Sequence, residues 1–399
     1  MRRWDSPSTR LIVLLTVLVT LGPLSTDLYL PALPLIRREL NASESLVQLT
    51  LSAYLAAFAV AQLFYGALSD RFGRRSVLLI GLLIYLLASW ACTQADNIGE
   101  LILLRMLQGL GACSGPVIGR AVVRDVWSGM EVARIMAITS GAMALAPMFA
   151  PLLGSLITES FGWQGNFVAL ALLALFQIVF TSLWLGETNR YKDTHATNLR
   201  RMLRNFGAML SVRDYLGHLM LLSFSFGGLF AFVSGASFVF IDHYGLSLTQ
   251  FGMAFAVMVM GYITGTLCVA RMQYRIGGER LLRVGVRLSA TSAVLMMLFH
   301  GLEYWPMVSL IIGQFFVAVG IGIVMPMAFA RALLPFPQMA GAASALLGFM
   351  QAMFASLVGV LVGSGISIHI NALPFAICIC MLLTWLCHHF LFREVVAKS

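Results

Sequence analysis

Two ionisable residues stand within long apolar segments of this sequence, where charges are rare. Asp27 lies in the stretch PLSTDLYLPALP, and Arg105 lies in the stretch LLRMLQGLGACSG. A carboxylate that is shielded from water favours its protonated form, whereas a nearby guanidinium favours the ionised form. A carboxylate under both influences can bind and release a proton. We therefore expect Asp27 and Arg105 to form a proton-coupling site.

The depth of these residues in their segments supports this expectation. A charge at the centre of a bilayer costs about 2.5–3.5 kcal/mol on insertion scales, so it persists when it is paired, protonated or facing a wet cavity. At about 1.5 Å per residue, Asp27 lies roughly 10 Å and Arg105 roughly 8 Å from the nearer ends of their segments. The alternative is a fixed ion pair that only holds two helices together. The prolines around Asp27 further predict a broken helix (Pro23, Pro31 and Pro34).

Composition indicates what kind of structure must position these residues. Hydrophobic residues make up 59% of the 399 residues and charged residues 11%, whereas soluble domains have about 25% charged residues. The mean hydropathy is +0.88. These values exclude a water-soluble fold and predict an integral membrane protein. The net charge of +9 falls mainly in short loops between apolar runs, so we expect a lipid bilayer, and no nucleic acid, as partner.

Roughly twelve apolar runs reach the length of about 20 residues that a membrane-crossing helix needs. We predict an all-α membrane protein of twelve transmembrane helices in two pseudo-symmetric six-helix bundles. The bundles are expected over 1–188 and 216–399, with a cytoplasmic linker over 189–215. In the linker, LRRMLRNFGAML (Leu199 to Leu210) predicts an amphipathic surface helix, with a plain linker as the alternative. The runs cover 11–33, 46–68, 76–95, 101–123, 134–158, 165–186, 216–240, 249–272, 280–301, 306–330, 339–363 and 370–392.

Alternate loops differ in charge, which predicts the orientation of the chain. One set of loops carries Arg37 and Arg38, offset by Glu39 and Glu44. The other set carries the remaining basic clusters, and loops rich in Lys and Arg stay in the cytoplasm. We therefore expect a multi-pass protein of the cytoplasmic (inner) membrane with both termini cytoplasmic. The clusters include Arg2, Arg3, Arg10, Arg71, Arg74, Arg75, Arg124, Arg134, Arg190, Arg213, Arg271, Arg283, Arg331, Arg393 and Lys398.

The loop between the second and third runs carries the stretch GALSDRFGRR. Gly73 suits a tight turn, and the acidic Asp70 among basic residues predicts ion pairing or helix capping. The stretch RIGGER near Gly277 echoes this turn in the second half of the chain. Two similar halves in parallel are a known plan of secondary transporters, with the site between the halves.

These motifs give the chain a family resemblance. It resembles a drug exporter of the major facilitator superfamily, in the twelve-span drug:proton antiporter group. It is similar over its whole length to the Bcr/CflA type of bicyclomycin and chloramphenicol exporters. The resemblance is carried by STDLYLPALP, GALSDRFGRR, RAVVRD, LAPMFAPLLG and FPQMAGAASALLG.

The resemblance implies a conformational latch at the turn between the second and third runs. Asp70 would cap or contact the start of the eleventh run, and Arg74 would pair with Asp125. In the fifth run the family's antiporter motif, Gly-Pro followed by a paired glycine, bends the helix. Here the chain reads Ala150-Pro151 and Gly154-Ser155 at these places. The implied latch residues are Gly66, Asp70, Arg71, Gly73, Arg74 and Asp125, and the implied bend residues are Pro147, Pro151 and Gly154.

Aromatic and amide side chains within the apolar runs are candidates for binding substrate. Several recur at helical spacing, and aromatic walls with a few amides suit an amphiphilic ligand of loose specificity. Each is open to the alternative that it packs against another helix or faces lipid. The candidates are Tyr29, Tyr54, Phe58, Gln62, Gln108, Phe226, Phe230, Met258, Tyr262, Gln314 and Gln351.

The resemblance implies export of amphiphilic drugs or antibiotics in exchange for protons, through alternating access by a monomer. Two alternatives remain open: a major facilitator exporter or symporter of one small metabolite, and a membrane sensor that does not transport. The sequence has no G-x-x-x-x-G-K-[ST], H-E-x-x-H or G-x-S-x-G motif, so we expect no ATP use, enzyme activity, cofactor or metal.

Overall fold

The computed structural model describes residues 9–189, 192–194 and 196–391. This part of the chain is almost entirely helical and contains no strand. Eleven of its helical segments are long and apolar enough to cross a membrane. The all-α, multi-pass membrane protein predicted from composition is therefore confirmed. Five residues of the charge argument lie outside the described residues (Arg2, Arg3, Arg190, Arg393 and Lys398).

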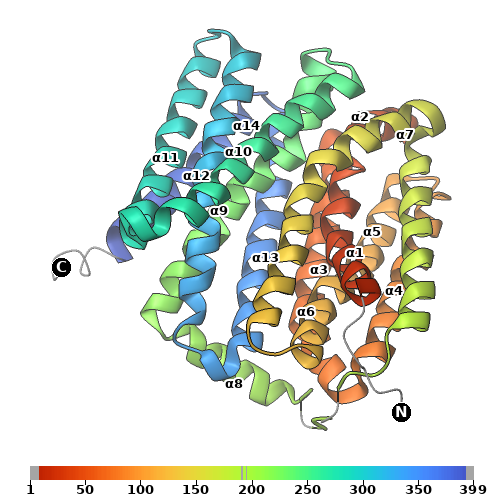
Figure 1. Ribbon diagram of the computed structural model, residues 1–399. Coiled ribbons are helices and arrows are strands. Elements are labelled where there is room, and N and C mark those ends of the chain that lie inside the picture. The colour runs from red at the N-terminus through yellow and green to blue at the C-terminus, as the bar shows by residue number, and fades with distance from the viewer. Residues whose placement is uncertain (1–8, 190–191, 195, 392–399) are drawn as a thin grey trace.

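The first six predicted runs correspond to five helical segments, because one segment makes two crossings. Helix α7 has 55 residues, about 80 Å at 1.5 Å per residue, which is enough to cross a bilayer twice. Gly162, with φ of +70°, breaks it between the predicted fifth and sixth runs, and α7 turns back there (Figure 1). The elements are α1 (Thr9–Asp27), η1 (Leu30–Ala32), α2 (Leu33–Glu39), α3 (Glu44–Phe72), α4 (Arg74–Cys92), α5 (Ile98–Ala112), α6 (Ser114–Val126) and α7 (Met130–Trp184).

The second half begins with the predicted amphipathic helix, which is confirmed as α8 over the same residues, Leu199–Leu210. Met209 is buried on one face of α8, and Arg200 and Arg204 are exposed. Its position on a membrane surface stays a prediction. The elements that follow are α9 (Arg213–Ser237), η2 (Phe238–His243), α10 (Leu248–Ile276), α11 (Gly278–Gly301), α12 (Pro306–Leu333), η3 (Pro337–Met339), α13 (Ala340–Ile366) and α14 (Ala372–Leu391).

Helices α1 to α7 and helices α9 to α14 occupy opposite sides of the molecule (Figure 1). Helix α3 packs against α13, and α7 packs against α10. Small residues allow the first of these contacts: the hydroxyl of Ser356 donates to the carbonyl of Ser52 at 2.8 Å. A Cβ atom on Gly348 would lie only 2.0 Å from the side-chain nitrogen of Gln62. Glycines thus let these two helices approach closely.

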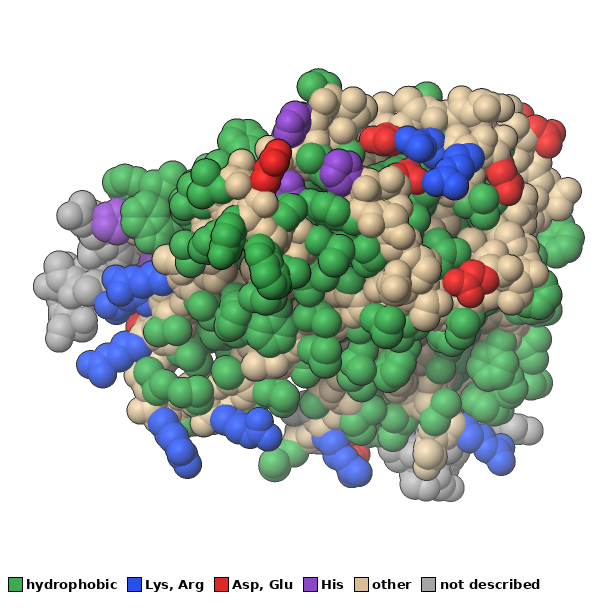
Figure 2. Space-filling model, turned by 90° about the horizontal axis from the view of Figure 1, so that it is seen from above, with side chains coloured by type: hydrophobic (Ala, Val, Ile, Leu, Met, Phe, Trp, Pro, Cys, Tyr) green, Lys and Arg blue, Asp and Glu red, His purple; other side chains and the backbone are tan. Residues whose placement is uncertain are grey.

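The two ends of the helix bundle differ in charge. We call the end that carries the α3–α4 turn and α8 the basic end, because Arg71, Arg74, Arg75 and the arginines of α8 lie there. The opposite end carries α2 and η2. Seen from above (Figure 2), hydrophobic side chains cover much of the molecule, and basic and acidic side chains lie side by side in one place on this face. Each end therefore carries charged groups that can connect separate elements.

Candidate functional site

Asp27 lies at a break in the first crossing. Helix α1 ends at Asp27, and the 3₁₀ turn η1 begins at Leu30. The broken helix predicted from the prolines is therefore confirmed. The Asp27 side chain is buried, and its carboxylate lies 2.9 Å from the hydroxyl of Thr26. The same hydroxyl lies 2.9 Å from the carbonyl of Pro23, so Thr26 donates to only one of these two acceptors at a time.

Helix α7 lies directly against this break. A Cβ atom on Gly154 would lie 1.9 Å from the backbone carbonyl oxygen of Leu28, the residue after Asp27. The predicted bend residues Pro147 and Pro151 lie in the same helix. Ser155, which departs from the family motif, has its hydroxyl 2.8 Å from the carbonyl of Leu248 in α10. This segment of α7 therefore connects the Asp27 break to the second half of the chain.

Arg105 is fully buried and is surrounded by aromatic rings. The centre of its guanidinium lies 4.8 Å from the ring centroid of Tyr29, 4.4 Å from that of Tyr54 and 5.8 Å from that of Phe167. Such contacts stabilise a cation through the negative face of each ring. Arg105 also donates to the side-chain oxygen of Gln108. We call these five residues the Arg105 site.

The structure does not bring Asp27 and Arg105 together. Within the described ranges, no acidic side chain lies within 4.0 Å of Arg105, and no basic side chain lies within that distance of Asp27. The fixed ion pair considered from the sequence is therefore absent from this conformation. The physical reason is that Tyr29 and Tyr54 flank the guanidinium and Gln108 accepts from it. Communication between Asp27 and Arg105 stays a prediction.

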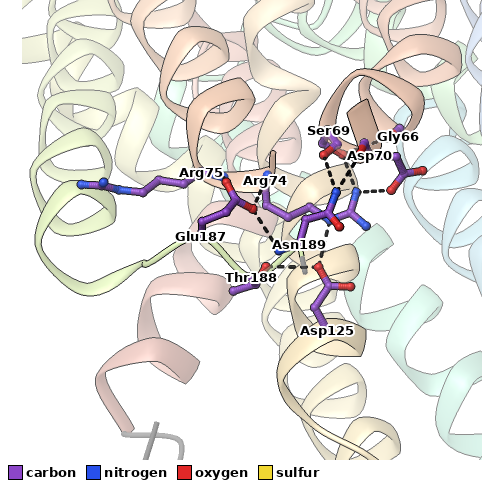
Figure 3. Close-up of polar contacts among 9 residues, drawn as sticks. All are labelled: Gly66, Ser69, Asp70, Arg74, Arg75, Asp125, Glu187, Thr188 and Asn189. Atoms are coloured by element: carbon purple, nitrogen blue, oxygen red, sulfur yellow. Dashed lines mark hydrogen bonds and ion pairs between the residues drawn. The ribbon is translucent and has the colours of Figure 1, made fainter. Parts of the chain in front are cut away.

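The α3–α4 turn brings three of the predicted latch residues together (Figure 3). The Nε atom of Arg74 donates to Asp125 at 2.9 Å, and its Nη1 atom lies 2.5 Å from the carboxylate of Asp70. Gly73 has a φ of +104°, a conformation that favours glycine. Asp70 thus pairs with Arg74 in this conformation rather than contacting the start of α13. The side chain of Arg71 donates to Thr197 at 2.6 Å.

A segment after the sixth run completes this turn, and the sequence reasoning missed it. The carboxylate of Glu187 accepts from the backbone N–H groups of Arg74 at 2.9 Å and Arg75 at 3.3 Å, and so caps the start of α4. Asn189 donates to the carbonyl of Asp70 at 2.8 Å, and Thr188 donates to Asp125 at 3.1 Å. The available signal was the short polar stretch GETN, directly after an apolar run.

The second half carries a counterpart of this turn. Gly277 precedes α11 with a φ of +87°, as Gly73 precedes α4. Arg331 near the end of α12 pairs with Glu279 at the start of α11. The positions of the two charges are reversed between the halves. In the first half the arginine, Arg74, starts the helix after the turn, and the carboxylate, Asp125, lies at the end of the neighbouring helix.

A second charged group, also missed from the sequence, joins the two halves at the opposite end. The carboxylate of Asp242 in η2 lies 2.8 Å from a guanidinium nitrogen of Arg38 and 3.3 Å from one of Arg37. Arg37 also pairs with Glu44 at 2.6 Å. We call these four residues the Asp242 cluster. Its sequence signal was weak, because Arg38 and Asp242 are 204 positions apart.

A cavity of about 740 Å³ lies between the two halves at the basic end. Of the predicted substrate-binding side chains, only Gln62 lines it in the described part of the chain. Tyr29, Tyr54 and Gln108 belong to the Arg105 site instead. Gln314 is fully buried, and its amide has no hydrogen-bond partner there. The others are buried or half-buried within the bundle: Phe58, Phe226, Phe230, Met258, Tyr262 and Gln351.

Comparisons with known proteins agree with this architecture. A D-xylose-proton symporter has a crystal structure that matches with a TM-score of 0.76 at 15% identity, over 94% of this chain and 97% of that chain. At that identity the match shows the fold alone.

Sequence relatives are closer. An uncharacterized MFS-type transporter of Bacillus subtilis, YdgK, is 35% identical over 88% of each chain. The bicyclomycin resistance protein homolog of Haemophilus influenzae is 30% identical over 95% of each chain. Multidrug resistance protein D of Escherichia coli is 28% identical over 86% of each chain. The model of the Major Facilitator Superfamily matches residues 15–360, and the chain therefore belongs to the Major Facilitator Superfamily.

Proposed function

We propose that this protein is a secondary active transporter that exports amphiphilic drugs or antibiotics in exchange for protons, by alternating access. The names of two relatives, a bicyclomycin resistance protein homolog and a multidrug resistance protein, support a drug as cargo. The observation that carries proton coupling is the buried carboxylate of Asp27 at a break in a membrane-crossing helix. Charged residues at such places mark proton and ion pathways.

Asp27 would act by exchanging one proton per cycle with the two sides of the membrane. When Asp27 is ionised, the hydroxyl of Thr26 would donate to it; when Asp27 is protonated, its own O–H would be able to donate to Thr26, whose hydroxyl would then donate to the carbonyl of Pro23. Inward movement of one charge through 100 mV releases about 2.3 kcal/mol. At about 1.4 kcal/mol per tenfold, this supports roughly a fiftyfold gradient of a neutral drug.

The conformation described here would be the one open to the cytoplasm. The cavity lies at the basic end, and we expect that end to face the cytoplasm because loops rich in Lys and Arg stay there. The Asp242 cluster and the α7–α10 contact hold the halves together at the other end. In the opposite state, Asp70 would leave Arg74 and contact the start of α13, so that the basic end closes. We place the protein in the cytoplasmic membrane as a monomer with both termini cytoplasmic.

The test is drug–proton exchange by purified protein in proteoliposomes. Asp27→Asn is expected to insert and fold, and to pass drug down a gradient, but to lose accumulation driven by a pH gradient. The matched control is Asp96→Asn, which removes an exposed carboxylate at a loop and should behave as the wild type. Uphill export by Asp27→Asn at the wild-type rate would remove Asp27 from the coupling mechanism.

The same proteoliposomes test whether the substrate is a range of drugs or one metabolite. A panel of unrelated amphiphiles, chloramphenicol among them, should include several compounds that the wild type moves with protons. Transport of a single small metabolite with none of the panel would replace drug export by the alternative of a dedicated metabolite carrier.

A further inference from the structure

The cavity at the basic end is built from both halves of the chain. Its walls come from α3 and α6 on one side, from α12 and the start of α13 on the other, and from α8 beneath. Its volume of about 740 Å³ is within the range of roughly 300–1,000 Å³ typical of pockets for drug-sized ligands. Because both halves line it, a molecule in this cavity lies between the halves and not in the lipid.

Charges in the cavity do not balance. Four arginines and two aspartates line it. Arg74 pairs with Asp70 at 2.5 Å, and Arg201 lies 3.7 Å from Asp193. The two remaining arginines, Arg120 and Arg124, have no acidic side chain within 4.0 Å in the described part of the chain.

Arg120 and Arg124 lie one turn apart on α6, where like charges repel. Arg120 is partly buried, and its Nε atom donates to the carbonyl of Pro116 at 2.9 Å, which holds the side chain in place. A partly buried guanidinium without a counter-charge, as at Arg120, is costly unless an anion compensates it. Arg124 is exposed and adds a second positive charge beside it.

The facing helix adds positive potential. Helix α13 begins at Ala340, and its N-cap residue Met339 offers no side-chain hydrogen bond to the free N–H groups of the first turn. The guanidinium of Arg124 lies 3.9 Å from the position that a Cβ atom on Gly341 would take. The start of a helix attracts anions. Asp70, the nearby acid that could cap α13, is paired with Arg74 instead.

The remaining wall of the cavity suits an apolar body. Val117, Met202, Phe206, Phe329 and Leu333 contribute hydrophobic surface, and the amides of Gln62 and Gln338 lie among them. We propose that this cavity binds an amphiphilic anion, whose carboxylate, sulfonate or phosphate group lies between Arg120, Arg124 and the start of α13. This inference rests on the proposed function and names the substrate class: the exporter takes anionic amphiphiles in preference to neutral or cationic ones.

The experiment compares an anion with its neutral counterpart. Binding of the fluorescent acid 1-pyrenebutyrate and of its methyl ester is measured for full-length protein in phosphatidylcholine nanodiscs. The wild type should bind the acid at least about tenfold more tightly than the ester. Arg120→Gln/Arg124→Gln should lose that preference and keep the affinity for the ester, whereas Arg120→Lys/Arg124→Lys should retain most of the preference.

Arg204→Gln is the matched control, because Arg204 is an exposed arginine of α8 that does not line the cavity. It should bind both probes as the wild type does. Equal affinity of the wild type for acid and ester would overturn the proposal. So would a double Gln variant that loses both probes equally while it melts at the wild-type temperature.

A lipid headgroup is a second possible source of the same anionic chemistry, and nanodiscs that contain phosphatidylglycerol test it. If the transported anion is the ligand, this lipid should change the affinity for 1-pyrenebutyrate less than twofold. The proposal would be overturned in favour of a lipid site if the wild type lost pyrenebutyrate binding in these nanodiscs and retained phosphatidylglycerol, while the double Gln variant released that lipid.

Different results would refute proton-driven export and the preference for anions. Proton-driven export of neutral amphiphiles without any anion preference would overturn the substrate class and leave export in place. A clear anion preference in binding, without proton-driven movement of any compound, would support the anion site and refute the exporter.

Discussion

Replacing Gly154 by alanine places a methyl group at the contact between α7 and the break in the first crossing. The added Cβ would lie 1.9 Å from the carbonyl oxygen of Leu28, whereas real Cβ atoms essentially never approach closer than 3.0 Å. One of the two backbones must therefore move by about 1 Å or more, because neither atom belongs to a side chain that can rotate away.

The expected cost follows from two opposing effects. Overpacking of this kind costs up to about 3 kcal/mol, and replacing glycine by alanine within a helix returns about 1 kcal/mol. We expect a net destabilisation of about 2 kcal/mol. Since the displaced carbonyl follows Asp27 directly, we also expect proton-driven export to fall at least about tenfold, as misplacement by 1 Å does at reacting centres.

Gly141→Ala is the matched control for this prediction. Gly141 lies in the same helix, and a Cβ atom there meets nothing within 4 Å, so only the gain in helix propensity applies. The assays are thermal unfolding in detergent and drug–proton exchange in proteoliposomes. If Gly154→Ala melted and transported like Gly141→Ala, the close approach of α7 to Leu28 would have no bearing on coupling.

Three further predictions concern the charged contacts. Asp125→Asn should slow the transport cycle about tenfold or more and leave drug affinity within about twofold, because Asp125 holds α6 to α4 through Arg74 and does not itself line the cavity; loss of equilibrium drug binding with normal cycling would contradict this. Asp242→Asn removes two contacts of about 1 kcal/mol or less each. Spin labels on the α2–α3 and α11–α12 turns should therefore report that the population of molecules open at this end rises about tenfold. An unchanged distance distribution would show that the Asp242 cluster does not hold this end closed. Arg105→Lys keeps the charge but loses the flat guanidinium between Tyr29 and Tyr54, and should lower stability by about 1–2 kcal/mol in thermal unfolding; stability equal to wild type would mean that these ring contacts contribute nothing.

Hydropathy predicted the membrane crossings because each crossing needs a long apolar run. The bounds of α8 could be predicted because polar and apolar residues, such as Arg200 and Met209, lie on its two faces. The pairing of Arg74 with Asp125 came from the family resemblance. The expected proximity of Asp27 and Arg105 rested on their similar depth and on the resembled fold, in which the first and fourth helices line one cavity. Neither of these fixes the direction in which a side chain leaves its helix.

Contacts between segments that are distant in the chain could not be predicted from the sequence. Nothing near Arg74 indicates that Glu187 caps the start of α4, and nothing near Arg38 indicates Asp242, because such pairs form only when the helices assemble. The buried setting of Arg105 was missed for a similar reason. Its rings come from three separate segments, around Tyr29, Tyr54 and Phe167.

The reversed polarity of the two turns has a consequence for how the chain assembles. The two halves have similar turns, so the α3–α4 turn could dock wrongly on α12, and the start of α11 on α6. In such a swapped product Arg74 would face Arg331, and Glu279 would face Asp125. Both pairs would then repel, whereas both attract in the native arrangement. The two halves thus place opposite charges at equivalent positions, and the resulting repulsion disfavours misfolded pairings between them.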